Sequence, residues 1–409
     1  MMKMEKIELL APAGDLEKLV IAIDYGADAV YVGGKDFSLR AGAGNFSINE
    51  IADGVKYAHD RNKKCYMALN IFPHNEDIDP ICRYLDEIKD IGIDAYIVSD
   101  PGVIEIVKDM IPGAVMHLST QANATNYRAA RFWARQGVKR IILARELTVN
   151  EICQLKEELG DEVELEAFVQ GAMCVSYSGR CLLSNFMAGR DANSGNCAHP
   201  CRWKYSLMEE QRPGEYFPVE EDARGTYILN SRDLCMIGHL PELIKAGVAS
   251  VKIEGRMKSV FYVATVVSAY RKAIDSYYAD PERYIFDPEW LLELEKASHR
   301  EFTTGFYFGR PSQNYKTSEY SRDYTFVGLV KGYDSETGFA TVEQRNKMTA
   351  GEEIEVFGPG AGFFVQKLGE MYDEEGVALQ SAPHPQQILK IKMDRPVGVN
   401  YMLRRKDGN

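Results

Sequence analysis

Eight short apolar segments, each followed by a longer segment with apolar residues at helical spacing, dominate residues 1–280 of the chain. One such unit occupies roughly 30 residues, the length of a strand, a helix and their loops. The strand-like segments are 6–14, 27–34, 64–70, 94–100, 114–122, 138–146, 164–172 and 248–255. This alternation predicts an α/β protein whose first domain is a (β/α)8 TIM-like barrel. A doubly wound open sheet is the structural alternative.

Two helix starts carry explicit N-terminal signals. Asp15 precedes the helical segment 16–26 and suits an N-cap, because its carboxylate can accept a hydrogen bond from a free amide of the first turn. Ser47 begins the segment 47–62, and Glu50 follows three residues later, which is the capping-box pattern. Both signals support helices between the apolar runs.

The pattern changes after the eighth unit. Residues 281–322 contain several prolines and many aromatic residues, and they predict a linker with a short helix near 290–299. From 323 to 409 apolar and polar residues alternate in short runs that turn residues separate. This part predicts a small all-β C-terminal domain, folded as a barrel.

Composition bounds the class of protein. No apolar run reaches the ~18 residues that a membrane span needs, and the first residues lack the apolar core and cleavage site of a signal peptide. The sequence therefore predicts a cytoplasmic protein with no membrane partner. A net charge of −12 disfavours indiscriminate nucleic-acid binding, although it is compatible with a local basic patch. In the cytoplasm, eight cysteines indicate thiols or metal ligands before disulfides.

Four of these cysteines lie in one glycine-rich stretch, 166–203, that includes the end of the seventh predicted strand. They are Cys174, Cys181, Cys197 and Cys201, with the spacing Cys-x6-Cys-x15-Cys-x3-Cys. Four thiolates can hold a zinc ion or an iron–sulfur cluster. Structural zinc usually uses two close pairs, and only the last two cysteines form one, so the spacing favours a cluster. Buried thiols acting as small apolar side chains are the third interpretation.

The other four cysteines are interpreted differently. Cys65, Cys82 and Cys153 occupy apolar positions of predicted strands or helices, which indicates the core. Cys235 opens the segment 233–247, which we interpret as a helix. It is either a core residue or a fifth ligand that replaces one of the four.

Polar residues follow the fifth predicted strand, and in such barrels functional side chains gather where strands end. His117, Ser119 and Gln121 alternate, so a strand that ran through all three would present them on one face. They would there bind substrate or transfer protons. A hydrogen-bonded structural histidine is the alternative for His117.

Charged residues mark two further strand ends. Arg145 ends the sixth strand, and Lys252, Glu254 and Arg256 alternate along the eighth. If these three face inward, they meet at the barrel mouth, where the two cations offset the carboxylate, because buried charge is costly unless it is paired or used. Lys258 adds positive charge nearby. A basic rim of this kind would suit a phosphate-bearing ligand or RNA, whereas ordinary surface lysines and arginines are the alternative.

Signatures of common hydrolases are absent from the sequence. There is no G-x-S-x-G nucleophile elbow, and the SYSGR run at 176–180 does not fit it. There is no H-E-x-x-H zinc-protease motif either. The chain therefore shows no complete protease constellation.

Several motifs resemble peptidase family U32, also called collagenase-like. The most specific is E-x-F-x-x-G-A-x-C followed by Y-S-G-R-C-L-x-S, at 166–184. The others are ELLAPAGD at 8–15, HLSTQANATN at 117–126, CAHPCRWKY at 197–205, NSRDL at 230–234 and VKIEGRMKS at 251–259. The resemblance covers nearly the whole chain, including the family's C-terminal β domain.

Within that family the chain is most similar to the branch that takes part in prephenate-dependent C5 hydroxylation of the wobble uridine of tRNA, which forms 5-hydroxyuridine. The resemblance implies a [4Fe-4S] cluster held by Cys174, Cys181, Cys197 and Cys201, with zinc as the alternative. It also implies prephenate as a cosubstrate, tRNA as a partner and another U32 protein as a hetero-partner.

The strand-end positions themselves supply the other site candidates. The catalytic candidates are His117, Arg145 and Glu254, and the substrate-binding candidates are Gln121, Lys252 and Arg256. The cations would hold anionic groups of the substrates. Two other functions fit the same family: a collagenase-like peptidase that uses His117 and Glu254, and a non-catalytic, cluster-bearing protein that delivers substrate to a partner enzyme.

Overall fold

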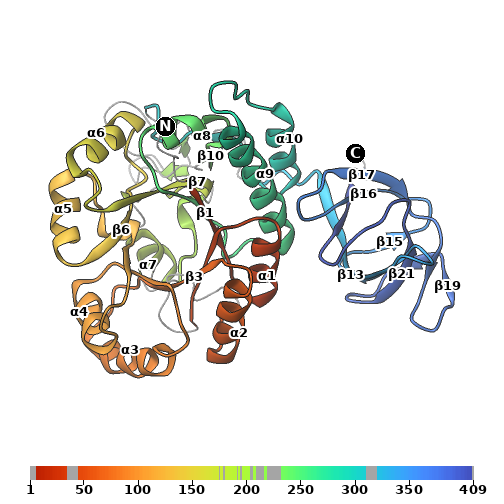
Figure 1. Ribbon diagram of the computed structural model, residues 1–409, viewed down its shortest axis with the longest axis horizontal. Coiled ribbons are helices and arrows are strands. Elements are labelled where there is room, and N and C mark those ends of the chain that lie inside the picture. The colour runs from red at the N-terminus through yellow and green to blue at the C-terminus, as the bar shows by residue number, and fades with distance from the viewer. Residues whose placement is uncertain are drawn as a thin grey trace.

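The computed structural model describes residues 6–34, 45–174, 176–177, 180–190, 192–193, 196–202, 206–208, 216–218, 232–309 and 320–407. Its main feature is a closed barrel of eight parallel strands (Figure 1). The strands are β1 (Glu8–Pro12), β2 (Ala29–Val32), β3 (Lys64–Leu69), β4 (Ala95–Val98), β5 (Met116–Leu118), β6 (Val138–Ile142), β7 (Glu164–Ala172) and β11 (Ser250–Ile253). Because β11 pairs with both β7 and β1, the sheet closes, which excludes the doubly wound alternative.

Helices follow the strands and surround the barrel. They are α1 (Leu16–Asp24), α2 (Ile48–His59), α3 (Asn75–Ile88), α4 (Pro101–Met110), α5 (Tyr127–Arg135), α6 (Val149–Leu159), α8 (Leu240–Lys245) and α9 (Val260–Ala279). Both predicted caps are confirmed: Asp15 Oδ1 accepts from Lys18 N at 2.9 Å, and Ser47 and Glu50 form a capping box. No helix among the described residues is long and apolar enough to cross a membrane.

A long insertion separates β7 from β11. Its described parts are α7 (Leu183–Ala188), η3 (Pro200–Arg202), β8 (Ser206–Met208), β9 (Tyr216–Pro218), β10 (Asp233–Cys235) and η4 (Ile237–His239). The helix predicted over 233–247 is wrong at its start. Residues of β10 pair antiparallel with the end of β7, so this segment is extended and the α-helix begins only at Leu240.

The segment 281–322 contains the short helix α10 (Pro288–Lys296), which packs on α9, and β12 (Phe302–Thr303), which pairs with β10. The terminal domain is all-β, as predicted. Its strands are β13 (Tyr324–Asp334), β14 (Phe339–Gln344), β15 (Met348–Thr349), β16 (Glu353–Phe357), β17 (Phe363–Lys367), β18 (Met371–Tyr372), β19 (Ala378–Leu379), β20 (Ser381–Ala382), β21 (Ile388–Lys392) and β22 (Met402–Lys406). Within 320–407 the main sheet runs from β17 to β19 without a pairing between these two edges, so its ladder is open.

The terminal domain is docked on the barrel beside α9 and α10 (Figure 1). Phe261 of α9 stacks on Phe326, with ring centroids 5.7 Å apart. Arg404, whose side chain is fully buried, donates to Glu355 of its own domain at 2.7 Å and to Glu293 of α10 at 2.9 Å. Apolar packing and a buried ion pair therefore hold the two domains together.

We expect Arg404→Met to lower the free energy of unfolding by about 3 kcal/mol, because two carboxylates lose a buried partner while keeping some contact with water. Arg405→Met is the matched control. Its side chain is partly exposed and pairs with partly exposed Glu352, so its loss should stay below about 1 kcal/mol. Urea-induced unfolding followed by circular dichroism measures both. Equal losses would contradict the role given to Arg404.

Candidate functional site

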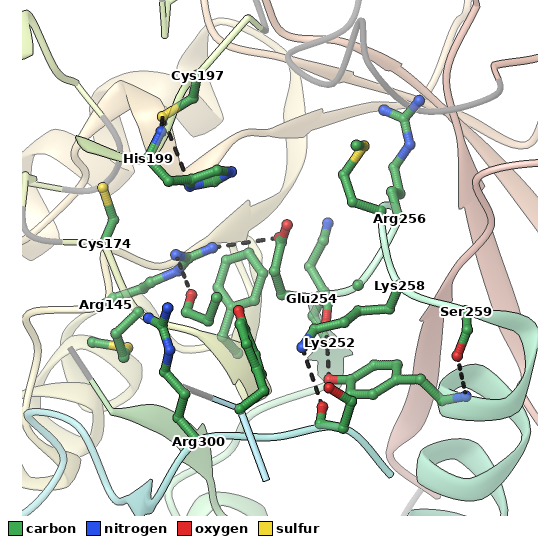
Figure 2. Close-up of a pocket in the computed structure, with 18 of the residues that line it drawn as sticks. Arg145, Cys174, Cys197, His199, Lys252, Glu254, Arg256, Lys258, Ser259 and Arg300 are labelled. Carbon is green, nitrogen blue, oxygen red and sulfur yellow. Dashed lines mark hydrogen bonds and ion pairs between the residues drawn. The ribbon is translucent and has the colours of Figure 1, made fainter. Parts of the chain in front are cut away.

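A cavity of about 990 Å³ opens at the carboxyl ends of the barrel strands. Ends of β3, β5, β6, β7 and β11 contribute to its wall, together with the cysteine stretch and the first residues of the terminal domain. Figure 2 shows part of this lining. Its volume lies at the upper end of the range for small-molecule sites, about 300–1,000 Å³. It is therefore large enough for a nucleoside and part of its backbone.

Arg145 and Glu254, two of the residues singled out at strand ends, meet inside this cavity, although their pairing was not predicted. Arg145 Nη2 lies 3.5 Å from Glu254 Oε2, and Nη1 donates to the backbone oxygen of Ala172 at 3.2 Å. The guanidinium carbon lies 4.1 Å from the centroid of the Phe168 ring. Gly171 permits this arrangement, since a Cβ there would lie 2.5 Å from the backbone oxygen of Glu254. The fold thus places one cation and one carboxylate side by side at the mouth.

Lys252 also lines the cavity, but the predicted trio on one strand face is wrong. The strand β11 ends at Ile253, so Glu254 and Arg256 lie beyond it. Lys252 donates to Glu166 Oε1 of β7 at 3.0 Å, and Glu166 also lies 3.4 Å from Arg140 Nη1. The partner of Lys252 is therefore a carboxylate inside the barrel and not Glu254.

Arg256 lines the cavity from another direction. Its Nη2 donates to Asn45 Oδ1 at 2.5 Å, and Figure 2 shows it directed away from the Arg145–Glu254 pair. The structure thus separates the predicted substrate-binding cations Lys252 and Arg256 into different parts of the wall.

Amide and hydroxyl groups form a third part of the wall. Asn70 Nδ2 donates to Ser119 Oγ at 3.2 Å and to Gln121 Oε1 at 3.1 Å. The predicted strand through Ser119 and Gln121 is wrong, because β5 ends at Leu118 and the chain turns into the 3-10 helix η1 (Thr120–Ala122), capped by Ser119. Gln121 nevertheless lines the cavity, as expected of a substrate-binding residue.

The four cysteines of the stretch line the same cavity. Cys174, Cys181, Cys197 and Cys201 are all free thiols. Asn193 holds the backbone of Cys181, accepting from its N at 3.2 Å and donating to its O at 3.1 Å. Cys235 lies on β10 outside the described lining, where burial raises its pKa to about 11. Its place in the core argues for the structural interpretation of that residue.

Comparison with known proteins now identifies the family. The model of peptidase family U32 matches residues 14–317, and the model of the peptidase family U32 C-terminal domain matches residues 322–404. The chain belongs to peptidase family U32.

Relatives within the U32 family carry different names. The chain is 44% identical to tRNA hydroxylation protein P1 of Bacillus subtilis, over 98% of this chain and 95% of that protein. It is 37% identical to the 23S rRNA 5-hydroxycytidine C2501 synthase of Escherichia coli, over 66% of this chain and 40% of that protein. A collagenase of Porphyromonas gingivalis is 31% identical over 90% of this chain and 91% of that protein.

The thiols of this U32 protein have the chemistry that a thiolate-bound metal group needs, since none of the four is in a disulfide and all line one cavity. In the described parts of the chain, no three His, Cys, Asp or Glu side chains are grouped so as to hold a metal ion. The four thiols therefore have the right chemistry for an iron–sulfur cluster and line one cavity, but they are not gathered as a ligand set in the part of the chain that the structure describes, and the cluster stays a prediction.

Several cavity residues were not anticipated from the sequence of this U32 chain, among them three on the far wall of the cavity. Arg300, Tyr320 and Arg322 follow the last barrel helix and complete the wall beside the terminal domain. No periodicity or motif marks them. Arg300 is placed by the pairing of β12 with β10, and Tyr320 and Arg322 lie just before the first strand of the terminal domain, so a strand-end argument on the barrel could not find them.

His117 lies deeper in the U32 barrel and is not among the described lining residues. It is buried, its ring meets Tyr66 edge-on with centroids 4.7 Å apart, and its Nδ1 has no hydrogen-bond partner among the described residues. Burial, with Arg140, Lys252 and Lys64 nearby, holds the pKa of His117 well below its usual value. This place favours the structural interpretation over direct proton transfer.

The shifted pKa of His117 predicts a pH dependence of stability. In the unfolded chain its pKa is about 6.5, so below that pH the unfolded state binds a proton that the folded state does not, and stability falls as pH falls. Between about pH 7 and about pH 5.5, protonation of His117 in the unfolded chain should by itself lower the free energy of unfolding by about 1 kcal/mol. We expect His117→Phe to lack this part of the loss in urea unfolding, while exposed His384→Gln keeps it. If the free energy of unfolding depended on pH in the same way in the wild type, His117→Phe and His384→Gln, the effect could not come from His117.

Proposed function

We propose that this protein takes part in C5 hydroxylation of the wobble uridine of tRNA, with a [4Fe-4S] cluster as cofactor and prephenate as cosubstrate. The similarity to tRNA hydroxylation protein P1 along nearly the full length of both chains carries the proposal. The rRNA 5-hydroxycytidine synthase supports it, because its name describes hydroxylation of another pyrimidine in RNA.

The cavity suits a pyrimidine that has left its stack. Enzymes that act on a base take it into a pocket, and a single-stranded loop such as the anticodon makes this inexpensive. The amides of Asn70 and Gln121 can donate to uracil oxygens and accept from its N3–H. Phe168 and Tyr31, which also line the cavity, offer apolar rings beside them. Specificity for uracil would come from this wall.

The charged residues have separate roles in the proposal. Glu254 is the only carboxylate among the described lining residues, which makes it the candidate general base of the cavity. Arg145 orients that carboxylate from 3.5 Å away. Lys252 and Arg256 would hold the carboxylates of prephenate or other anionic groups.

The four cysteines would hold the cluster at the wall of the cavity, where all of them are free thiols. When bound, a cluster there supplies one-electron transfer at the reaction site. A second U32 protein as hetero-partner is part of the proposal, and it would deliver or accept electrons or substrate at the mouth.

Nucleoside analysis of tRNA tests the proposal in a deletion strain without a redundant oxygen-dependent route. We expect wild-type protein to restore 5-hydroxyuridine derivatives, measured by mass spectrometry, and Glu254→Gln not to restore them. Glu336→Gln, an exposed carboxylate outside the cavity lining, is the control and should restore them. Unchanged nucleoside levels after deletion and complementation would refute the proposal.

A collagenase-like peptidase is the second candidate. Its structural support is the contact between Cys197 Sγ and His199 Nδ1, 3.8 Å apart at the cavity wall, since a thiol beside a histidine can act as a nucleophile. The pair predicted for a peptidase, His117 and Glu254, is not brought together at the cavity, because His117 is not among the described lining residues. Gelatin cleavage by purified protein that is lost in His199→Ala would favour a peptidase built on Cys197 and His199. The non-catalytic role, delivery of substrate to a partner enzyme, makes a different prediction. It would be favoured if the purified protein supported tRNA hydroxylation only after a partner enzyme was added.

A further inference from the structure

The cavity has a second end, at the seam between the barrel and the terminal domain. Its wall there consists of Lys258 and Ser259 at the start of α9, Arg300 before β12, and Tyr320 and Arg322 before β13. These residues come from three segments of the chain, and none belongs to the cysteine stretch. The seam is thus a separate group of side chains that the reaction at the cysteine end does not use.

Two cations of the seam lie against one aromatic ring. Lys258 Nζ lies 4.3 Å from the centroid of the Tyr320 ring, and Arg300 Cζ lies 4.6 Å from the same centroid. Lys258 Nζ also donates to Ser298 O at 3.2 Å, and Arg300 is only 5% exposed. Bringing two cations to one ring and partly out of water is opposed by their mutual repulsion. A bound anion would relieve that repulsion.

The charges along the cavity also favour an anion. Six described lining residues are lysine or arginine, namely Arg145, Lys252, Arg256, Lys258, Arg300 and Arg322, against the single lining carboxylate Glu254. Even with Lys252 balanced by Glu166 and Arg145 by Glu254, positive charge is in excess along the lining. The whole chain has a net charge of −12, so this concentration of positive charge is local. A cleft with one sign of charge focuses the field and raises the local concentration of oppositely charged ligand.

The start of α9 adds to the positive field. This helix has 20 residues, follows the last barrel strand and begins at the seam, where Ser259 Oγ accepts from Tyr262 N at 3.2 Å. The amino end of a helix carries roughly half a unit of positive charge. In (β/α)8 barrels, phosphate groups frequently bind near the last strands, at the start of a helix.

We infer that Lys258, Arg300, Arg322 and the start of α9 bind a backbone phosphate of the RNA, next to the nucleoside whose base enters the cysteine end. This inference rests on the proposed function, because it assigns the phosphate to tRNA. A backbone phosphate suits the seam better than a small phosphorylated ligand does. Arg322 is exposed at the rim, and the terminal domain supplies part of the wall, so a polynucleotide can continue past it.

Salt-dependent RNA binding by the full chain tests this subsite. The probe is a fluorescently labelled anticodon stem–loop, and anisotropy gives the slope of log K against log salt for each protein. We expect Lys258→Gln and Arg322→Gln each to weaken binding and to reduce the slope by at most about 0.7, the value for the full loss of one neutralised phosphate of a single strand, because the remaining cations still face that phosphate. The control Lys390→Gln, exposed on β21 outside the cavity lining, should keep the wild-type slope.

A second arm adds inorganic phosphate at matched ionic strength. Slopes that stay at the wild-type value in both variants overturn the subsite. Saturable phosphate binding with unchanged RNA slopes also overturns it, because the seam would then hold a small phosphorylated ligand. The proposed function is tested separately, in the deletion strain. If wild-type protein restores 5-hydroxyuridine there, the proposed function stands even where the phosphate subsite is overturned. Arg322 is exposed, so its variant reports on binding even where Lys258→Gln affects folding.

Discussion

Cys181→Ala is expected to lose bound iron and sulfide, the visible absorbance of the cluster and the ability to restore 5-hydroxyuridine in tRNA. Cys181 lines the cavity with three other free thiols, and its backbone is held at both N and O by Asn193. Removing one of four thiolates opens the cluster to solvent and oxygen. Anaerobic iron and sulfide determination and the visible spectrum report cluster loss independently of activity.

Cys153→Ala is the matched control. Cys153 is also a free thiol, but it lies on α6 on the outside of the barrel and is absent from the described cavity lining. Its variant should keep iron, sulfide and tRNA modification at wild-type levels. A colourless wild-type protein containing one zinc ion would contradict the cluster. Full iron content in Cys181→Ala would show that this cysteine is not a ligand.

The alternation of the sequence was sufficient to predict the barrel, because short runs rich in apolar residues alternate regularly with longer segments that repeat an apolar face at helical spacing. Even β7, the longest barrel strand, was placed at its observed bounds, 164–172. The predicted capping box at Ser47 and Glu50 is also present. Patterns of this kind depend only on residues that are close together in the sequence, so they can be recognised in a single sequence.

The errors arose where partners come from distant segments. Lys252 pairs with Glu166, which is 86 residues away in the chain, and no spacing rule connects them. The segment opening at Asp233 is extended because β7 and β12 pair with it, although its apolar spacing also suits a helix. His117 is buried against Tyr66 of β3, a contact with another strand that no spacing rule shows. In each case tertiary contacts override the local pattern.

Glu166→Ala is expected to lower the free energy of unfolding by about 3–5 kcal/mol, because it leaves buried cations without their carboxylate. Glu166 is fully buried in β7 and faces both Lys252 and Arg140. In this variant Arg140 still donates a hydrogen bond to Glu8. Lys252 has no second carboxylate within ion-pair distance among the described residues, so it loses its partner. Lys252 also loses its position at the cavity, so tRNA modification should fall with stability.

Glu164→Ala is the control, since it removes another carboxylate from the same strand and from the same Arg140, 2.7 Å away. The side chain of Glu164 is 55% exposed, so the loss should stay below about 1 kcal/mol. Adding Lys252→Met to Glu166→Ala should recover part of the lost stability, because the unpaired cation is then gone. It should not recover tRNA modification. Additive losses in the double variant would mean that Glu166 stabilises the barrel without pairing with Lys252.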